Sequence, residues 1–527
     1  LSDDYIKFIR FAHWKIEKTG KGVIGMITNN SYLSGLIHRG MRKKLLESFN
    51  EIYILNLHGN SRIGERCPDG SKDENVFDIM QGVAIALFIK DKPKKDMGRV
   101  YYQDIFGIRN KKYDFLENHD VTKIKWIELE PSEPYYFFVE KDFSKQSTYE
   151  KFWSVSEIFN KYSSGVTTHR DHFVVGFTKA EIKQRIRLFT GNLPDELVRQ
   201  GLDLKDTHDF NLKKAREKLR KCDWEESILP YSYRPFDDRF ICYSSELIDR
   251  DRHEVMQHFE KENLGLAVMR QYLFGPVKTY NYVFCVNKIS DRRLFISNRG
   301  AGFVFPLYLY PNTGNSETGN PIKKRSLGCA MMLFESKGEY SAKKPNLSPK
   351  LIGQLGSYFG KSPTPEKIFY YIYAILYSNI YRTTYAEFLK IDFPRIPFTK
   401  EYTLFNQMAE FGERLVGLHL MKSPELDITA TRFQGIGNGR IERPRYDAQT
   451  KRLYINLNQY FEDIPNSVWD YQIGGYQICD KWLKDRKGRD LSLEEIKHYC
   501  KVVTSIKKTM ELQPSIDKAF KEVIETI

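Results

Sequence analysis

The chain has 527 residues, of which 41% are hydrophobic and 28% charged, as is usual for folded soluble proteins. Its formal net charge of +14 and its pI of about 9.1 predict a positive surface field that attracts polyanions such as nucleic acids. No apolar run is long enough to span a membrane, and seven scattered cysteines without a CxxC pair argue against zinc and disulfides, so we expect a cytoplasmic protein of several domains with no membrane partner and no metal.

The first 125 residues alternate between helical and strand patterns. In chain order, the predicted elements are a helix over 5–16, a strand over 23–28, a helix over 38–49, a strand over 52–57, a polar loop over 58–74 and a strand over 83–89. The run 23–28 is apolar throughout, which is typical of a strand buried on both faces of a parallel sheet. This order predicts an α/β domain that is the closing half of a doubly wound sheet.

The pattern changes after residue 125 to short aromatic-rich strands, loops and isolated helices. We predict a mixed α+β region over 126–345, a helical spacer over 346–425 and a second mixed region over 426–527. Residues 491–527 have the pattern of a pair of helices.

Several segments, taken in order, resemble the type ISP and related single-chain restriction–modification enzymes, whose methyltransferase belongs to the adenine-N6 group. They are GVIGMITNNSYL (22–33), NVFDIMQGVAI (75–85), YRPFDDR (233–239), Tyr381-Arg382 with Tyr385, DFPRIP (392–397), Trp469, Gly474-Gly475-Tyr476 and Lys481-Trp482-Leu483. The first resembles the fifth strand of those methyltransferases, and the second resembles the entry to their antiparallel seventh strand.

The resemblance implies the end of a Rossmann-like methyltransferase domain over 1–125, followed by the target-recognition region. The full enzyme would transfer a methyl group from S-adenosylmethionine to a flipped adenine. The family's catalytic Asn/Asp-Pro-Pro-Tyr/Phe motif and its Gly-containing cofactor motif do not occur in this sequence. We expect both upstream of Leu1, so this chain would be inactive alone, and helicase and nuclease modules could belong to the same polypeptide.

Four residues are candidates for the pocket of the flipped base. By resemblance, Phe77 stacks on the base and Val76 lines the same pocket. Asn29 and Asn30 follow a strand end, where ligands gather in open α/β sheets. The alternatives are a core phenylalanine and a turn that uses asparagine for its backbone tolerance.

Three basic clusters are candidates for contacts with the DNA backbone, and a solvated basic surface is the alternative for each. They are Arg432, Arg440, Arg443 and Arg445 around the glycine-rich segment 435–439; Arg292, Arg293 and Arg299; and Lys484, Arg486, Lys487 and Arg489. A fourth charged run, Arg234, Asp237 and Arg239, alternates basic, acidic and aromatic residues. This pattern favours an internal ion-pair network over a base-reading role.

We therefore predict a chain that recognises a sequence in double-stranded DNA and contributes part of a base-flipping pocket. Two alternatives stay open. One is a non-catalytic specificity module that guides a separate catalytic chain, and the other is an RNA-binding or RNA-modifying protein.

Overall fold

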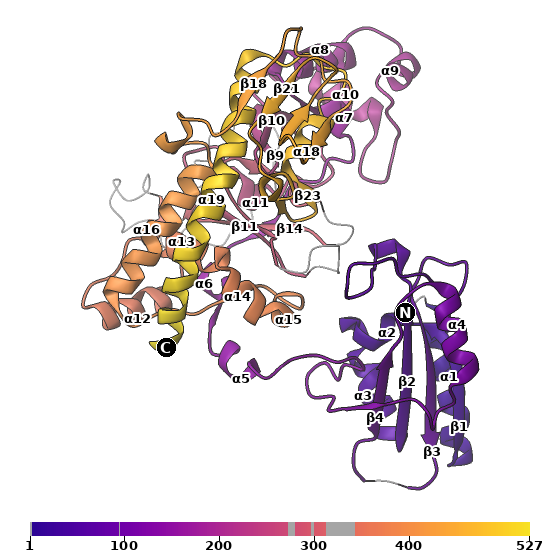
Figure 1. The fold of residues 1–527 in the computed structure, drawn as a ribbon. Coiled ribbons are helices and arrows are strands. Elements are labelled where there is room, and N and C mark those ends of the chain that lie inside the picture. Colours follow the sequence, from indigo (N-terminus) through magenta and orange to yellow (C-terminus); the bar gives the residue numbers. More distant parts are fainter. Residues whose placement is uncertain (1–2, 94, 272–279, 297–299, 312–342) are drawn as a thin grey trace, which may run out of the picture. The chain divides into compact units, whose positions relative to one another are not determined.

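The computed structural model describes residues 3–93, 95–271, 280–296, 300–311 and 343–527 (Figure 1). Contacts divide the chain into a first unit, residues 1–145, and a second unit, residues 146–272 and 279–527.

The first unit is a five-stranded sheet with helices. Its elements are α1 (Asp4–Thr19), β1 (Gly22–Asn29), α2 (Ser31–Ser34), η1 (Leu36–His38), α3 (Arg39–Ser48), β2 (Glu51–His58), η2 (Ser61–Ile63), β3 (Val83–Lys90), β4 (Arg99–Asp104), α4 (Arg109–Asn118) and β5 (Ile127–Leu129). The strand order is β1-β3-β2-β4-β5. β3 lies antiparallel between β1 and β2, and β2 pairs with β4 in parallel. The predicted order of helices and strands is confirmed (Figure 1).

The prediction that residues 23–28 form a strand buried on both faces of a parallel sheet is wrong. β1 pairs only with the antiparallel β3 and lies at the edge of the described sheet. Its side chains alternate, so that Ile24 and Thr28 are buried while Val23 and Ile27 are exposed. An apolar run does not reveal that one face of its strand is uncovered.

The first unit extends to residue 145 and not to the predicted 125. β5 pairs with β4 at the far edge of the sheet. Beyond it, the backbone N–H of Phe138 donates to the Leu33 carbonyl over 2.9 Å, and the buried Arg42 donates to the Tyr136 carbonyl over 2.8 Å. These contacts attach the segment after β5 to the first unit.

The second unit begins with short helices and strands and then builds three four-stranded sheets. Its elements up to residue 345 are α5 (Gln146–Tyr149), β6 (Trp153–Ser154), α6 (Val155–Ile158), β7 (Ser163–Ser164), α7 (Asp171–Val174), β8 (Val175–Gly176), α8 (Lys179–Thr190), α9 (Asp195–Gly201), α10 (Leu212–Leu219), β9 (Ile228–Arg234), β10 (Asp237–Cys242), α11 (His253–Met256), η3 (Gln257–Phe259), β11 (Gly265–Met269), β12 (Val283–Val286), β13 (Ile289–Ser290), β14 (Gly302–Pro306), β15 (Tyr308–Leu309) and β16 (Lys344–Pro345).

The remainder of the unit is helical first and then returns to strands. Its elements are α12 (Pro349–Phe359), α13 (Pro365–Tyr377), α14 (Asn379–Thr384), α15 (Ala386–Leu389), β17 (Arg395–Ile396), α16 (Tyr402–His419), η5 (Pro424–Leu426), β18 (Arg432–Gln434), β19 (Arg445–Asp447), β20 (Arg452–Tyr454), β21 (Tyr460–Glu462), α17 (Asn466–Trp469), β22 (Gln472–Ile473), β23 (Tyr476–Gln477), α18 (Ile478–Lys484) and α19 (Leu493–Glu525). The four-stranded sheets have the orders β13-β9-β10-β8, β12-β11-β14-β7 and β18-β21-β20-β19.

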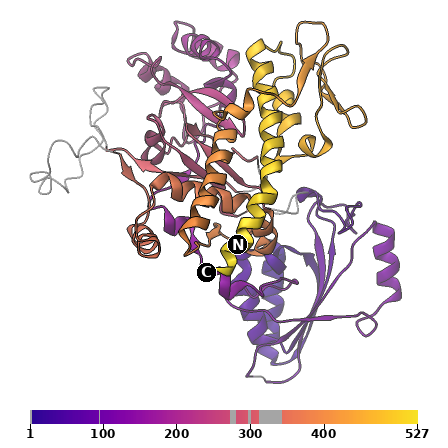
Figure 2. The same cartoon turned by 60° about the vertical axis from the view of Figure 1, so that its left-hand side comes forward.

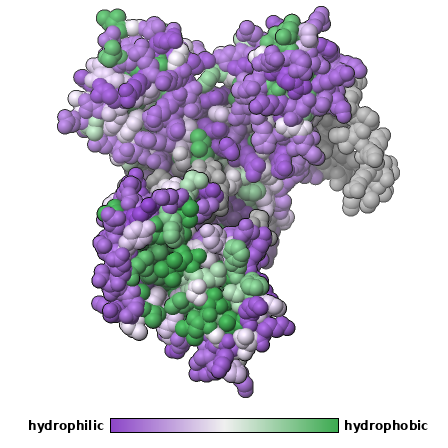
Figure 3. All heavy atoms as spheres, turned by 90° about the vertical axis from the view of Figure 1, so that its right-hand side faces the viewer, coloured by the Kyte–Doolittle hydropathy of each residue, from purple (hydrophilic) through white to green (hydrophobic). Residues whose placement is uncertain are grey.

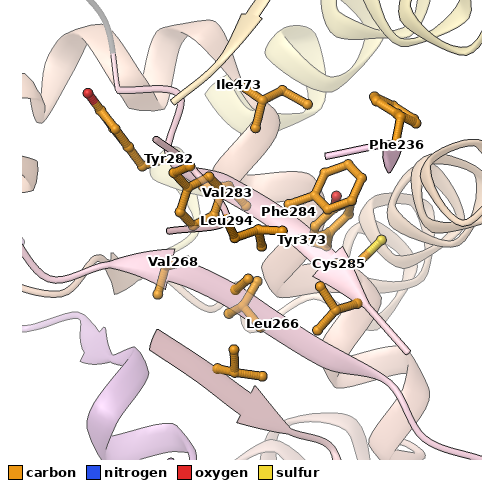
Figure 4. Close-up of a cluster of buried hydrophobic side chains, with 14 of the residues drawn as sticks. Phe236, Leu266, Val268, Tyr282, Val283, Phe284, Cys285, Leu294, Tyr373 and Ile473 are labelled. Carbon is orange, nitrogen blue, oxygen red and sulfur yellow. The ribbon is translucent and has the colours of Figure 1, made fainter. Parts of the chain in front are cut away.

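One hydrophobic core joins the regions that the sequence analysis separated at 345 and 425. This core runs from Tyr149 to Val523 and takes side chains from all three regions. Figure 4 shows Leu266 of β11 and Phe284 of β12 close to Tyr373 of α13. The helical spacer is therefore part of this core and does not form a unit of its own.

The chain ends in a single long helix and not in the predicted pair. α19 has 33 residues and includes Pro514, whose ring removes one backbone donor. Buried side chains from Tyr499 to Val523 hold the helix along its length, and α16 and α13 lie beside it (Figure 2). This packing compensates for the bond lost at Pro514.

None of the helices in the described ranges combines the length and the apolar character that crossing a membrane requires.

Candidate nucleic-acid interface

The small sheet β18-β21-β20-β19 brings the first predicted arginine cluster together. Arg432 starts β18 and Arg445 starts β19, while Arg440 and Arg443 lie on the connection between these strands. All four side chains are exposed. Within the described ranges, Arg440 alone of the four has a carboxylate within ion-pair distance, because its guanidinium lies 3.5 Å from Asp490. Arg445 stacks on Tyr454, with 4.6 Å between the guanidinium carbon and the ring centre.

A fifth arginine belongs to this sheet and was missed by the sequence analysis. Arg452 starts β20 and stacks on Tyr460 at 4.6 Å. The sequence gives little indication of it, because Arg452 lies well after the glycine-rich segment. Only the pairing of β20 with β19 and β21 places it beside the other arginines. We call Arg432, Arg440, Arg443, Arg445 and Arg452 the arginine sheet.

The connection after β18 is held by side-chain amides. Buried Gln459 accepts a bond from the backbone N–H of Gly439 over 2.9 Å. Asn456 donates to the carbonyl of Arg440, also over 2.9 Å. At Gly435 the backbone has φ +96°, and a Cβ there would lie 2.0 Å from the Asn458 carbonyl oxygen. A glycine is therefore required for the two loops to lie this close.

The run Arg234, Asp237 and Arg239 forms the predicted internal network. Asp237 is fully buried and accepts bonds over 2.7 Å from both Arg239 and Arg486. Burial alone would raise the pKa of the Asp237 carboxyl, but the charges of these two arginines hold it below its usual value. Arg234 lies 3.1 Å from the buried Asp291.

The third predicted cluster is not one DNA-facing surface, and Arg486 is a wrong prediction within it. The Arg486 side chain is buried, bonds to Asp237 and lies over Trp482 at 3.6 Å. Arg489 pairs with Glu181 over 2.9 Å. Lys484 is exposed but bonds to Asp480 over 2.6 Å, and Lys487 is exposed. Of the four residues in this cluster, only the two lysines are exposed.

The second predicted cluster is described only in part. Arg293 is exposed and Arg292 is half-buried, and the backbone N–H of Arg292 donates to the Val166 carbonyl over 2.9 Å. Arg299 lies outside the described residues.

In the first unit, Phe77 lies at the rim of an apolar hollow of about 350 Å³. The hollow is lined by Tyr5, Ile27, Thr28, Phe77, Ile79 and Val83. Such a volume is within the range of small-molecule sites. The Phe77 ring is 43% exposed and is therefore not an ordinary core phenylalanine. This hollow lies at the end of β1, where ligands were expected.

The other three predicted pocket residues do not line this hollow. Val76 is 3% exposed and belongs to a small buried cluster with Leu55 and Leu57. Asn29 is buried, donates to Asp3 over 2.8 Å and accepts from Ser31. Asn30 donates to Asn56 over 3.0 Å. Both asparagines therefore have structural roles next to the hollow.

Asn30 leads into a polar cluster that the sequence analysis missed. Asn56 donates to the Tyr102 hydroxyl over 2.9 Å, and His58 lies 2.6 Å from Asp104 and 2.8 Å from Glu65. Burial on its own would lower the pKa of His58, but the two carboxylates outweigh it and raise the pKa to about 9. A charged histidine can donate a hydrogen bond to each of the two carboxylates, so both have a partner. This arrangement is typical of a structural cluster.

Groups of three or more His, Cys, Asp or Glu side chains placed to hold a metal ion do not occur within the described ranges.

A small sheet with five arginines on its strands and its glycine-rich β18–β19 connection has the features expected of a nucleic-acid-binding module. The family of Type ISP C-terminal specificity domains matches residues 157–513, which is more than half of the chain. The chain belongs to this family. No curated protein matches it.

Three solved structures have the same fold over nearly the whole chain. The ATP-dependent Type ISP restriction-modification enzyme LlaBIII bound to DNA is 24% identical, with a TM-score of 0.72 over 97% of this chain and 34% of its own. A nuclease-deletion mutant of the Type ISP enzyme LlaGI with a DNA substrate mimic is 20% identical, with a TM-score of 0.68 over 97% and 40%. The DrdV–DNA complex is 19% identical, with a TM-score of 0.71 over 98% and 52%. The chain thus spans about a third of the length of LlaBIII and about half that of DrdV.

Proposed function

We propose that this chain recognises a sequence in double-stranded DNA, as the specificity part of a restriction–modification enzyme. The observation that supports it best is the arginine sheet, in which three arginines on the strands and two on the β18–β19 connection belong to one small sheet of a Type ISP specificity domain. Arginines at this density neutralise phosphates and so fix the position of the protein on a duplex. The DNA in the LlaBIII, LlaGI and DrdV structures agrees with this proposal.

The test is a competition between duplex DNA and single-stranded RNA with the same number of phosphates. The chain is first bound to a labelled duplex at moderate salt, and each competitor is then titrated in. We expect unlabelled duplex to displace the label at lower concentration, because a rigid pair of strands presents phosphates at fixed spacing. More effective displacement by RNA would overturn the proposal.

For the first unit, we propose that it forms one wall of the base pocket of an adenine-N6 methyltransferase. Phe77 at the rim of the apolar hollow supplies the aromatic face on which an extruded adenine stacks. The antiparallel β3 between β1 and β2 supports the resemblance to the last strands of such a domain. S-adenosylmethionine supplies the methyl group when bound, at a site mostly outside these residues.

The exposed apolar surface of the first unit supports this proposal as well. Tyr5, Phe8, Phe11, Val23 and Ile27 are exposed on α1 and β1, and Figure 3 shows apolar side chains gathered on one face of this unit. A contiguous apolar face of this kind marks an interaction site. We infer that the rest of a methyltransferase domain, in the same polypeptide as any helicase and nuclease modules, covers it.

The pocket is tested by Phe77→Ala in the full-length enzyme. We expect turnover to fall by about a hundredfold while duplex affinity changes by less than about threefold, because stacking matters only after the base leaves the helix. The matched control is Met80→Ala, since Met80 is also an exposed apolar residue of this segment but does not line the hollow. Equal losses of turnover and affinity in Phe77→Ala would indicate a folding role.

A further inference from the structure

Two large aliphatic side chains stand almost completely exposed beside the arginine sheet. Ile436 is 93% exposed and lies on the connection after β18, and Leu457 is 92% exposed and lies on the turn between β20 and β21. Neither side chain belongs to the hydrophobic core of the unit. They therefore add nothing to the core and are available to contact a partner.

The two side chains lie on loops that touch each other. A Cβ on Gly435 would meet the Asn458 carbonyl, and a Cβ on Gly437 would meet the side chain of Gln459. The residues on both sides of Ile436 thus lie against the residues just after Leu457. The two side chains therefore stand on adjacent loops, and we call Ile436 and Leu457 together the apolar tip.

This tip is held in place before any partner arrives. Asn456 accepts bonds from the backbone N–H groups of Asn458 and Gln459, over 3.0 and 2.8 Å, which closes the turn around Leu457. Gln459 receives the Gly439 N–H and so fastens the other loop to the same turn. A tip that is already ordered loses little conformational entropy when it binds.

The charges around the tip indicate the partner. Arg432 lies on the strand before the connection that carries Ile436, and Arg440 lies on that connection. Arg452 lies on β20, the strand that leads into the Leu457 turn, and Arg445 lies on the neighbouring β19. A protein partner of ordinary composition would not require an apolar tip on a sheet this rich in arginine. A duplex fits this combination, because phosphates line both sides of its grooves and the flat, apolar faces of its base pairs become accessible when two neighbouring pairs are unstacked.

We propose that the tip of Ile436 and Leu457 enters a groove of the bound duplex and wedges between adjacent base pairs, so that the DNA bends. Proteins that kink DNA use apolar side chains in this way, and the cost of unstacking is compensated by further backbone contacts. In this chain the arginine sheet provides those contacts. The inference rests on the proposed function, because it requires that this face binds duplex DNA.

The test measures affinity and bending with the full chain and a mixed-sequence duplex labelled at its two ends with a fluorophore pair. We expect the wild-type chain to shorten the distance between the ends. In the double variant Ile436→Asn with Leu457→Asn, we expect that shortening to disappear and the affinity to fall by about tenfold.

Two further variants serve as controls. Ile428→Asn removes an aliphatic side chain that is 88% exposed but lies before β18, outside the tip, and it should leave both affinity and bending unchanged. The conservative pair Ile436→Leu with Leu457→Ile should keep the bend, because only apolar bulk is needed. All three variants change exposed residues, so an unchanged thermal midpoint will confirm that each one is folded.

The outcomes separate this inference from the proposed function. If the double asparagine variant still bends DNA and binds it like wild type, the wedge is wrong while the arginine sheet stands. If that variant changes the self-association of the chain and not its DNA binding, the tip is a contact between copies and the inference is also overturned. If the wild-type chain binds no duplex, the proposed function itself fails.

Discussion

Two groups of arginines in the second unit look alike in the sequence and have opposite surroundings in the fold. The half-buried Arg239 and the buried Arg486 both bond to Asp237, whereas the exposed Arg432 and Arg443 have no carboxylate within ion-pair distance among the described residues. The buried arginines have lost water and need their partner, and the exposed ones keep their charge available to a ligand. The comparison shows that an arginine's role depends on whether it is paired with a carboxylate and how deeply it is buried. The local density of basic residues in the sequence does not decide it.

Among the substitutions that test this comparison, removing the buried Asp237 carboxylate should have the largest effect, and the effect should be on stability. Asp237→Asn removes the buried carboxylate to which both Arg239 and Arg486 bond, and leaves them, among the described residues, only the more distant Asp485 at 3.5 Å and Glu495 at 3.6 Å. We therefore expect the free energy of unfolding to fall by about 3–5 kcal/mol. Urea unfolding measures it. The matched control is the neighbouring Asp238→Asn, because the Asp238 side chain is 51% exposed and pairs with Lys288 at the surface. Equal losses in the two variants would show that burial does not distinguish these carboxylates.

Removing the exposed charges should weaken binding and leave the fold intact. We expect the quadruple variant Arg432→Ala, Arg440→Ala, Arg443→Ala and Arg445→Ala to lose about a hundredfold in duplex affinity at low salt, for all sequences alike. The slope of log affinity against log salt should decrease by up to about four. Fluorescence anisotropy over a salt series measures both. Unchanged affinity for a nonspecific duplex would rule out the arginine sheet as a backbone contact.

Lowering the pH should reduce the stability that the buried Asp237 carboxylate contributes, and this effect should be smaller than those above. The pKa of Asp237 is raised by burial and lowered more strongly by Arg486 and Arg239, so in the folded chain it lies below its usual value. The stability from this carboxylate is therefore present above about pH 4 and is lost as the pH falls through the folded pKa. The stability gap between wild type and Asp237→Asn should narrow over that range. A stability difference between wild type and Asp237→Asn that grows as the pH falls would contradict the lowered pKa of Asp237.

The smallest effect is expected at the exposed pair of Arg440 and Asp490. Both side chains are about half exposed and 3.5 Å apart, so Asp490→Asn should change stability by less than about 0.5 kcal/mol. Because the change frees Arg440, duplex affinity should rise by about twofold at low salt. Thermal unfolding and anisotropy measure the two quantities. A fall in affinity would show that Asp490 orients Arg440 for binding.

The sequence predicted the order of helices and strands in the first unit, because local periodicity determines each element. It did not predict that β1 lies at an edge, since pairing with β3 depends on residues about sixty positions away. It predicted four arginines that the fold brings together at the proposed binding surface, and it predicted the internal role of Asp237. It misassigned Arg486, because the partner that buries it is 249 positions away. Sequence periodicity does not predict contacts between residues that are far apart in the chain.

The central claim is that this chain reads sequence in duplex DNA through the second unit. The most direct measurement is selection from a random-sequence duplex pool, carried out in parallel with the wild-type chain and with the quadruple arginine variant. We predict that the wild-type chain enriches one short sequence over successive rounds, and that the variant recovers much less DNA at the same salt. Recovery of DNA by the wild-type chain without any enriched sequence would contradict the claim.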